Sequence, residues 1–360
     1  MDTSKIDLET LGWDPFFKES FAPYQERGFI PGRVIEVQRR SSIAFTKAGE
    51  LIVTLSRKYE SDNGLYPVVG DWVAIQETTK EDAGFIMAVL ARKNKFSRRA
   101  AGKEMKEQVL AANVDYVWIV TDLDKDFNVP RIERYLTLVS ESGSQPVVIL
   151  NKSDVSRDLD EKTEEIKRLD PSIPVHIMSA ELDTGLGELK RYMIKGKTIT
   201  ILGSSGVGKS TIINRILGEE RQDTCPIREK DGRGRHITSY RELILLPKGG
   251  MIIDNPGMRE LQLWTDGKGI IEVFDDIEAL ALRCKFSDCR HRTEPGCAVK
   301  KALETGELDA NRFANYLKLK TEVEFLAIRQ NKMLRVAEKA KWKNIKKWGK
   351  EIQEHKKGKE

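Results

Sequence analysis

The 360-residue sequence is poor in cysteine and aromatic residues and has no long hydrophobic run. With four cysteines, three of them close together, a disulfide framework is not favoured. No apolar stretch approaches the roughly 20 residues that cross a bilayer. The first residues also lack the basic and then apolar layout of a signal peptide. These absences lead us to expect a soluble, cytoplasmic protein.

Charge is plentiful, at 32% of residues beside 39% apolar residues, and it is unevenly placed. A chain of this length and composition can form two or three compact units. Residues 331–360 carry eleven Lys or Arg against four Glu, although the whole chain has a net charge of only +5. Such a basic tail indicates an anionic partner, either nucleic acid or a membrane surface. A solvated, partly helical tail is the alternative.

Turn signals divide residues 28–97 into five short β-rich segments, which predict a small RNA-binding barrel of the OB type. The segments are residues 32–38, 42–46, 50–55, 70–75 and 85–90. An aromatic-rich N-terminal extension, residues 1–27, is expected to pack across this barrel. The basic segment 93–112 resembles a connector.

From residue 98 to residue 274 strand and helix patterns alternate, which predicts a mostly parallel sheet with flanking helices. Expected strands are 116–120, 146–150, 175–178, 198–202, 242–246 and 251–254; expected helices are 130–142, 161–169, 186–192 and 209–217. Residues 275–330 are expected to form a mostly helical domain, and residues 331–360 a basic C-terminal tail. The predicted fold class is multi-domain α/β, with a barrel, a P-loop domain and a helical domain.

A glycine-rich loop follows the strand at 198–202 and opens the helix at 209–217, as a phosphate-binding P-loop requires. Backbone N–H groups at a helix N-terminus stabilise phosphate oxygens. Lys209 would reach the β- and γ-phosphates, and the Ser210 hydroxyl would bind Mg²⁺. The expected contacts with the nucleotide are Gly203, Ser204, Ser205, Gly206, Val207, Gly208, Lys209, Ser210 and Thr211.

The tetrapeptide Asn151-Lys152-Ser153-Asp154 predicts that the nucleotide is GTP or GDP. A carboxylate can accept hydrogen bonds from N1–H and N2–H₂ of guanine, a donor pair that adenine lacks. The tetrapeptide follows an apolar strand, and open α/β sheets bind ligands at the carboxyl ends of strands. We expect Asn151, Lys152 and Asp154 to bind the base, with Ser179 and Ala180 in a second base-contacting loop. A loop-capping role for Asp154 is the alternative.

Two switch regions are expected after the P-loop. Asp254-Asn255-Pro256-Gly257 fits a DxxG signature, in which Asp254 holds the Mg²⁺ water shell and Gly257 senses the γ-phosphate. The polar stretch 231–239 lies where switch I is expected, with Thr238 as the Mg²⁺ ligand. The base-reading tetrapeptide precedes the P-loop, whereas GTPases usually have the reverse order. The chain is therefore predicted to be a circularly permuted GTPase.

The catalytic residues are expected to be Lys209 and His236. Ras-like enzymes often carry a water-positioning glutamine directly after the DxxG glycine, where this chain has Met258. A thioether cannot orient water, whereas an imidazole can accept a proton near neutral pH. An ordinary surface role for His236 is the alternative.

The spacing Cys284-x₄-Cys289-x-His291-x₅-Cys297 predicts a metal site. Three thiolates and one imidazole leave no open position for substrate, and closed sites of this kind hold Zn²⁺ structurally. The alternative is a group of reduced thiols without metal. Cys225 is expected to be an incidental thiol.

Together, the OB-like barrel, the permuted GTPase motifs and the Cys₃His spacing resemble the RsgA (YjeQ) family of small-subunit ribosome-assembly GTPases. The resemblance covers roughly residues 28–330. It implies GTP hydrolysis stimulated by the 30S ribosomal subunit, contact with 16S rRNA and a part in late maturation of that particle. It also implies the nucleotide, switch and zinc roles given above. A monomer fits a factor that docks on one particle.

The sequence departs from the family pattern in both switches. Switch I usually reads G-x-H-T-T-T, whereas here it reads Gly234-Arg235-His236-Ile237-Thr238-Ser239, and switch II usually has Ser or Thr in place of Asn255. A GTP-gated RNA-binding module with vestigial hydrolysis is therefore the alternative function. A membrane-associated regulatory GTPase rests only on the basic tail, which has no clear apolar face and no lipidation motif.

Overall fold

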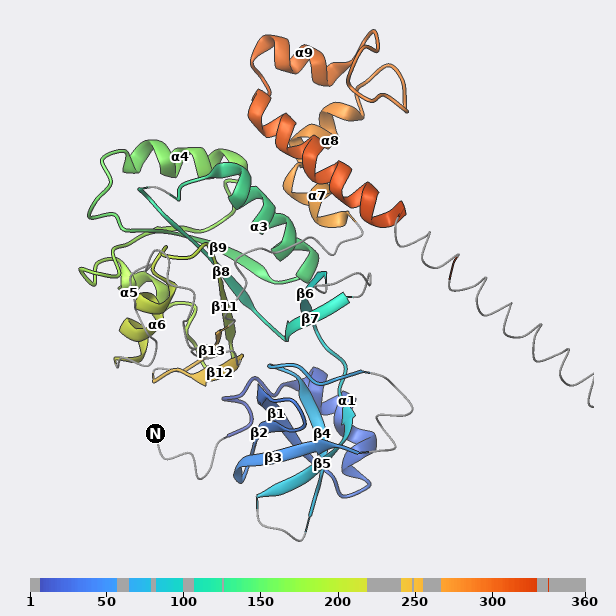
Figure 1. The fold of residues 1–360 in the computed structure, drawn as a ribbon, viewed down its shortest axis with the longest axis vertical. Helices are drawn as coiled ribbons and strands as arrows, with labels where there is room; N and C mark the ends of the chain where they lie inside the picture. The colour runs from blue at the N-terminus through green and yellow to red at the C-terminus, as the bar shows by residue number, and fades with distance from the viewer. Residues whose placement is uncertain are drawn as a thin grey trace, which may run out of the picture.

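The computed structural model shows a barrel, a sheet covered by helices, and a separate group of helices (Figure 1). The three parts follow one another in chain order, from the blue barrel through the green and yellow sheet to the orange and red helices. The structure describes residues 7–56, 65–78, 82–99, 107–124, 126–218, 241–247, 249–254, 267–328 and 336.

The N-terminal extension contains helix α1, Pro15–Gln25, which packs on the barrel. Asp14 caps this helix by accepting hydrogen bonds from the backbone N–H groups of Phe16 and Phe17. The buried rings of Phe17 and Phe21 pack with Trp13, whose ring centroid lies 4.7 Å from that of the buried Trp72. The prediction that the aromatic extension lies across the barrel is confirmed.

The barrel consists of five strands and is closed, as predicted. These are β1 (Ile30–Val37), β2 (Ser42–Thr46), β3 (Gly49–Leu55), β4 (Trp72–Glu77) and β5 (Ala83–Val89). Their order is β1-β2-β3-β5-β4, and β4 pairs with β1 to complete the ring. Because side chains alternate across each strand, small and branched apolar residues fill the interior. These include Val34, Ala44, Val53, Val73, Ile75 and Ile86.

The segment expected to be a connector contains a hairpin. Strands β6 (Lys95–Arg99) and β7 (Glu107–Ala112) pair with each other in a separate two-stranded sheet. Phe96 of β6 is buried, as are Leu110, Ala111 and Ala112 of β7, whereas Lys95 is exposed and Arg98 is half-buried. The high density of basic residues in this segment concealed the two strands in the sequence.

The central sheet has the strand order β10-β9-β8-β11-β13-β12. Its strands are β8 (Tyr116–Asp122), β9 (Gln145–Asn151), β10 (Val175–Ile177), β11 (Thr198–Leu202), β12 (Glu242–Leu245) and β13 (Met251–Asp254). All neighbouring pairs are parallel except β12 with β13. The predicted mostly parallel sheet is confirmed, with each predicted strand at its expected place.

Helices cover both faces of this sheet. Helices α3 (Val129–Ser142) and α4 (Leu159–Leu169) share one apolar cluster with inward side chains of β8 and β9. Helices α5 (Leu186–Leu189) and α6 (Lys209–Leu217) share another cluster on the opposite face. Helix α5 is shorter than expected, since the chain turns after Leu189 and buries Tyr192 and Met193.

The barrel and the central sheet are joined by backbone and side-chain contacts. Strand β1 of the barrel pairs with β12 at Glu36 and Glu242, so the two sheets are continuous. The fully buried Arg33 donates a 2.8 Å hydrogen bond to Thr198 Oγ1 in β11 and a further bond to the Leu11 carbonyl of the N-terminal extension. Burial lowers the pKa of Arg33 to about 10.

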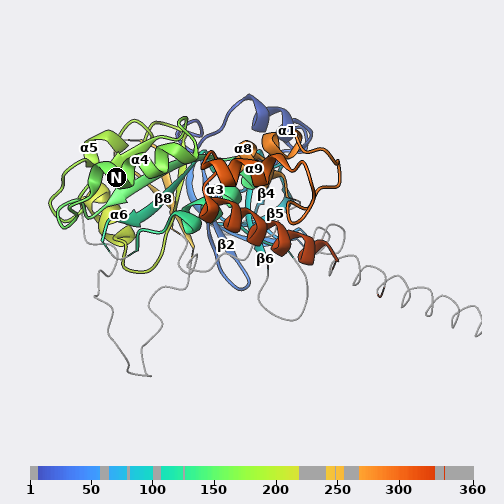
Figure 2. The ribbon, with the colours of Figure 1, turned by 90° about the horizontal axis from the view of Figure 1, so that it is seen from above.

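The C-terminal helices are α7 (Lys268–Val273), α8 (Asp275–Ala281), α9 (Ala298–Thr305) and residues 310–328. They contact α3 through α7 and through the last helical segment, while α8 contacts α7 and α9. The last segment runs beside α3 in both views (Figures 1 and 2). It carries Arg312, which forms a 2.6 Å ion pair with the buried carboxylate of Glu133 in α3. In the described part of the chain, no helix is long and apolar enough to cross a membrane.

Candidate functional site

The P-loop lies between β11 and α6, at the carboxyl edge of the sheet. Gly203, Gly206 and Gly208 all have positive φ, which L-residues with a Cβ rarely adopt. A Cβ at Gly208 would overlap the side-chain amide of Asn151, and a Cβ at Gly203 would overlap the Val120 carbonyl. The glycines therefore fix both the turn of the loop and its close approach to neighbouring strands.

Lys209 begins α6 and its side chain folds back over the loop. Its Nζ donates a 2.8 Å hydrogen bond to the Gly203 carbonyl and a second bond to the Ser204 carbonyl. Ser210 and Thr211 follow in the first turn and are partly exposed. The predicted phosphate-binding residues thus lie together, with the lysine ammonium held by the loop that it follows.

Asn151 ties the P-loop to both base-reading loops. Its Nδ2 donates a 2.7 Å hydrogen bond to the Val207 carbonyl, and its Oδ1 accepts one of 3.0 Å from the Ala180 N–H. The Asn151 side chain is buried, as an anchor between three loops requires. The structure brings the predicted guanine-reading and phosphate-binding segments to one edge of the sheet.

The other predicted base-contacting residues surround Asn151. Asp154 is exposed in the turn after β9, where its carboxylate is open to a ligand. Lys152 has a positive φ of 61° and forms a 2.9 Å ion pair with Asp122 at the end of β8. Ser179 is buried and bridges to Thr184, which shapes the second base-contacting loop.

Asp122 was not singled out in the sequence. Burial alone would raise its pKa, but the hydrogen bonds from Lys152 and from the Asp126 N–H lower it below the ordinary value. A second unexpected contact comes from Arg215 in α6, whose Nε donates to the Ala180 carbonyl at 3.1 Å. An acidic residue that ends a buried strand next to the P-loop strand is a signal that could have identified Asp122.

Asp254, the predicted switch II aspartate, ends β13 beside the P-loop strand. Strands β13 and β11 are parallel neighbours, and Thr200 Oγ1 of β11 donates to the Ile253 carbonyl at 3.0 Å. Asp254 therefore lies at the same sheet edge as the P-loop. The predicted catalytic His236, the Mg²⁺ ligand Thr238, the switch residues Gly257 and Met258, and Cys225 lie outside the described residues.

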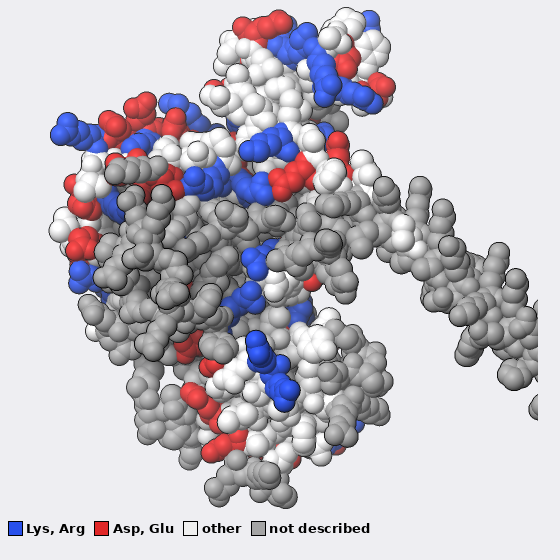
Figure 3. Space-filling view, viewed as in Figure 1, with Lys and Arg blue, Asp and Glu red and all other residues white. Residues whose placement is uncertain are grey.

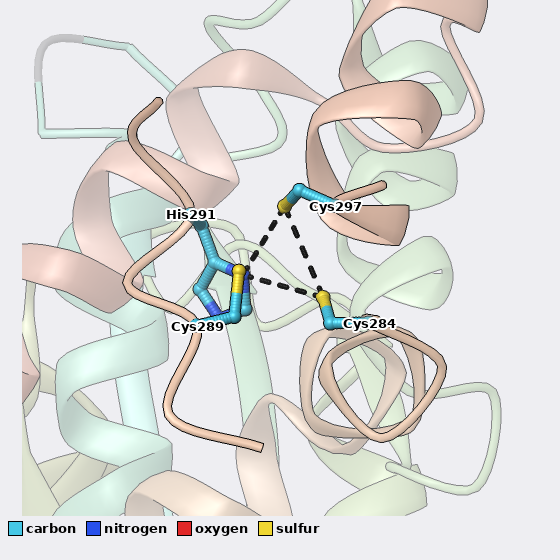
Figure 4. A group of neighbouring side chains, drawn as sticks. All are labelled: Cys284, Cys289, His291 and Cys297. Atoms are coloured by element: carbon cyan, nitrogen blue, oxygen red, sulfur yellow. Dashed lines mark hydrogen bonds between the residues drawn. The ribbon is translucent and has the colours of Figure 1, made fainter. Parts of the chain in front are cut away.

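The three clustered cysteines and His291 come together at one end of the C-terminal helices (Figure 4). Their ligand atoms all lie within 4.8 Å of one another. His291 Nδ1 is 3.4 Å from Cys297 Sγ and 3.6 Å from Cys284 Sγ, and the Sγ atoms of Cys284 and Cys297 are 3.9 Å apart. A tetrahedral Zn²⁺ with Zn–S bonds of about 2.3 Å places its sulfur ligands roughly 3.8 Å apart. The spacing of these atoms fits a metal ion of that kind.

Local structure holds these four residues in place. Cys284 follows α8, and Cys297 caps α9 by accepting a hydrogen bond from the Lys300 N–H. In the loop between them, Glu294 accepts hydrogen bonds from the N–H groups of Arg290, Arg292 and Thr293. Backbone N–H groups, first its own and then that of Arg292, lower the pKa of Glu294 to about 2. The loop is therefore organised by a charged carboxylate around Cys289 and His291.

Comparison with known families is consistent with this geometry. A family model described as RsgA GTPase matches residues 89–264, and one described as 50S ribosome-binding GTPase matches residues 198–339. The curated protein "Small ribosomal subunit biogenesis GTPase RsgA" of Opitutus terrae is 44% identical over 352 residues, which are 94% of this chain and 96% of that protein. The chain belongs to the RsgA GTPase family.

Another curated relative and two solved structures are also similar over most of the chain. The RsgA protein of Methanosarcina acetivorans is 42% identical over 94% of this chain and 92% of its own length. The crystal structure of YjeQ from Thermotoga maritima has a TM-score of 0.62 at 28% identity, and it covers 82% of this chain and 98% of that one. YloQ, a circularly permuted GTPase, has the same fold with a TM-score of 0.57 at 23% identity. Membership makes this chain a circularly permuted GTPase, a GTP hydrolase that uses GTP, GDP and Mg²⁺, as the sequence predicted.

Proposed function

We propose that this chain binds the 30S ribosomal subunit through 16S rRNA and assists its late maturation, with GTP turnover that the subunit stimulates. The observation that carries the proposal is the match to small ribosomal subunit biogenesis GTPases over nearly the whole chain. The chain would act as a monomer in the cytoplasm, where its ribosomal partner is assembled.

In the nucleotide site we assign phosphate binding to the P-loop backbone and to Lys209. The ammonium of Lys209 is already oriented by the carbonyls of Gly203 and Ser204, and a phosphate would replace or join them as its partner. Ser210 would supply a hydroxyl to Mg²⁺, and Asp254 would hold its water shell. Mg²⁺ would neutralise charge that develops on the phosphates during hydrolysis.

Guanine recognition is assigned to Asp154, with Asn151 and Lys152 as its support. The exposed carboxylate of Asp154 is free to accept from both guanine donors, while Asn151 fixes the loops around the base. In switch I, Thr238 would complete the Mg²⁺ site and His236 would orient the attacking water. GTP would order both switches and favour binding to the subunit, and hydrolysis would release the protein.

The Cys₃His cluster is proposed to hold one structural Zn²⁺. Three thiolates and an imidazole at these separations suit Zn²⁺, and the four residues would fill its tetrahedral shell. Bound zinc would cross-link the end of α8, the 285–296 loop and the start of α9. The cross-link would stabilise the loop, because a loop of this size has no hydrophobic core of its own.

The loop around the cluster is the candidate rRNA contact outside the barrel. Figure 3 shows Lys and Arg side chains over the uppermost domain, which carries the cluster. Among the described residues Arg283, Lys285, Arg290 and Arg292 are exposed there, beside a Phe286 that is 42% exposed. Cationic side chains next to an accessible aromatic ring suit phosphate contact and base stacking.

The test is GTP turnover by the purified protein alone, with 30S subunits and with 50S subunits. We expect stimulation by 30S only, and loss of it in Lys209→Ala and His236→Ala. Lys190→Ala, which removes an exposed lysine from the end of α5, is the matched control and should behave as wild type. Stimulation by 50S instead would overturn the assigned partner. GTP binding that modulates RNA affinity without any turnover would favour the vestigial-hydrolysis alternative.

A further inference from the structure

The side chain of Ser204, the second residue of the P-loop, is held by helix α3. Arg131, in the first turn of α3, donates from Nη1 to Ser204 Oγ at 2.6 Å. Tyr135 lies one turn further on the same helix face and forms a side-chain hydrogen bond with Ser204. Burial raises the pKa of Tyr135, and the hydrogen bond with Ser204 only partly opposes this shift. Two side chains from one helix therefore converge on a single P-loop hydroxyl.

Arg131 is itself fixed by the acidic segment after β8. Its Nη1 forms an ion pair with Asp126. The Asp126 N–H donates to Asp122 Oδ1 at 2.7 Å, and Asp122 Oδ2 accepts from Lys152 at 2.9 Å. A continuous set of polar contacts thus runs from the base-reading tetrapeptide to Ser204. Because the guanidinium is anchored at Asp126, its position relative to the P-loop is defined before any ligand binds.

The backbone carbonyl of Ser204 contacts Lys209. The Ser204 carbonyl accepts from Lys209 Nζ, and the Gly203 carbonyl accepts from the same atom at 2.8 Å. A shift of Ser204 would therefore move one of the two carbonyls that aim the lysine. Displacements of about 1 Å in such positioning groups are enough to slow an enzyme considerably.

We propose that Arg131 is a positioning residue for the γ-phosphate: it holds Ser204, and through the Ser204 carbonyl it orients the Lys209 ammonium. The inference rests on the proposed role of Lys209 in phosphate binding. Since GDP has no γ-phosphate, a misaimed lysine weakens the interaction with GTP and with the transition state more than the interaction with GDP. A purely structural contribution of Arg131 would affect both nucleotides alike.

The experiment measures the binding of fluorescent GTP and GDP analogues and single-turnover GTP hydrolysis by the full chain without ribosomal subunits. Arg131→Ala is expected to lower the single-turnover rate about tenfold, the order expected for one charge-assisted hydrogen bond, with GDP affinity changed less than about threefold. Ser204→Ala should give the same pattern, and the double variant should be no worse than either single one. Arg131→Lys should restore part of the rate, because it keeps the charge but not the planar fork.

Arg134→Ala is the matched control. Arg134 lies on the same helix and donates two 2.8 Å hydrogen bonds to the Glu322 carboxylate. The variant therefore also loses an ion pair of α3, but this pair joins α3 to the C-terminal helices. We expect its GTP hydrolysis rate without subunits to match wild type. Equal weakening of GTP and GDP by Arg131→Ala, or strictly additive losses with Ser204→Ala, would overturn the proposal. Unchanged nucleotide binding and hydrolysis in Lys209→Ala would instead overturn the proposed nucleotide site.

Discussion

The Asn151 amide and the Val207 carbonyl are 56 residues apart in the chain and are joined by a 2.7 Å hydrogen bond. This bond connects the end of β9 with the P-loop, so the segment predicted to read the base is tied directly to the segment predicted to hold phosphates. In a permuted chain the two segments appear in the reverse of the usual order. The parallel neighbours β9, β8 and β11 nevertheless end at the same edge, which keeps the geometry of the site.

Asn151→Ala is expected to destabilise both the fold and the nucleotide complex. It removes the partners of the Val207 carbonyl and the Ala180 N–H, and an unsatisfied buried group costs about 1–3 kcal/mol. Thermal unfolding and binding of a fluorescent GDP analogue would measure the two effects. Asn151→Asp is the informative comparison, since it keeps the acceptor for Ala180 but places a carboxylate oxygen against the Val207 carbonyl in place of the donor. If both variants unfold at the same temperature as the wild-type protein, the Asn151 amide does not anchor these loops.

Asp154→Ala is expected to weaken GTP and GDP binding by about a hundredfold or more, with little change in stability. Its exposed carboxylate would lose two charge-assisted hydrogen bonds to guanine, each of about 1.5–3 kcal/mol. Competition binding with GTP and ATP measures the change. Asp158→Ala serves as the control, because Asp158 lies near the start of α4 and makes no side-chain cap. Retained preference for GTP over ATP in Asp154→Ala would contradict the assignment.

Asp122→Asn is expected to change the acid dependence of stability. The pKa of Asp122 is lowered in the folded protein, so its charged form stabilises the fold above the ordinary carboxyl pKa, and this contribution disappears as pH falls through the lowered value. The variant should be less stable at pH 7 by at most about 1 kcal/mol, since the partner Lys152 is more than one-third exposed. Urea unfolding at pH 7 and at pH 4 and below should show the difference narrowing in acid. A difference that does not depend on pH would show that the ion pair is not its source.

Arg33→Ala is expected to loosen the junction between the barrel and the central sheet. The substitution removes a buried guanidinium and leaves the Asn113 carbonyl, Thr198 Oγ1 and the Leu11 carbonyl without this donor. A buried acceptor left without a donor costs about 1–3 kcal/mol. Limited proteolysis and calorimetry should show separated barrel and GTPase transitions. Arg27→Ala, on the surface after α1, should leave a single wild-type profile.

Cys284→Ser is expected to abolish the binding of one equivalent of zinc. The substitution leaves three ligands, and the loop between α8 and α9 would lose its cross-link. Zinc released on denaturation, measured with a chromogenic chelator, gives the stoichiometry. Cys225→Ser is the matched control and should retain one equivalent. Purified wild-type protein that binds no zinc would support the alternative of reduced thiols.

Much of the fold and of the site could be predicted because the relevant signals are local. Turn signals between β-rich segments indicated the five barrel strands, and strand-like runs before the P-loop and before Asn151 located two strands of the central sheet. The glycines of the P-loop were informative because their positive φ angles and close contacts exclude other side chains. The Cys₃His spacing was sufficient to predict the cluster, since all four residues lie within fourteen positions.

The sequence by itself determined most of the strands and helices, the chemistry of the nucleotide and cysteine motifs, and the permuted order, because periodicity and motif spacing are properties of neighbouring residues. The tertiary structure decided which distant residues meet. In the sequence, Arg131 is one of many arginines in helical segments. Its role follows only from the packing of α3 beside the P-loop, which places Arg131 Nη1 2.6 Å from Ser204 Oγ. The pairing of β1 with β12 and the burial of Arg33 likewise depend on how whole elements are placed. Such contacts join residues far apart in the chain, and only the packed topology brings their polar groups within hydrogen-bonding distance.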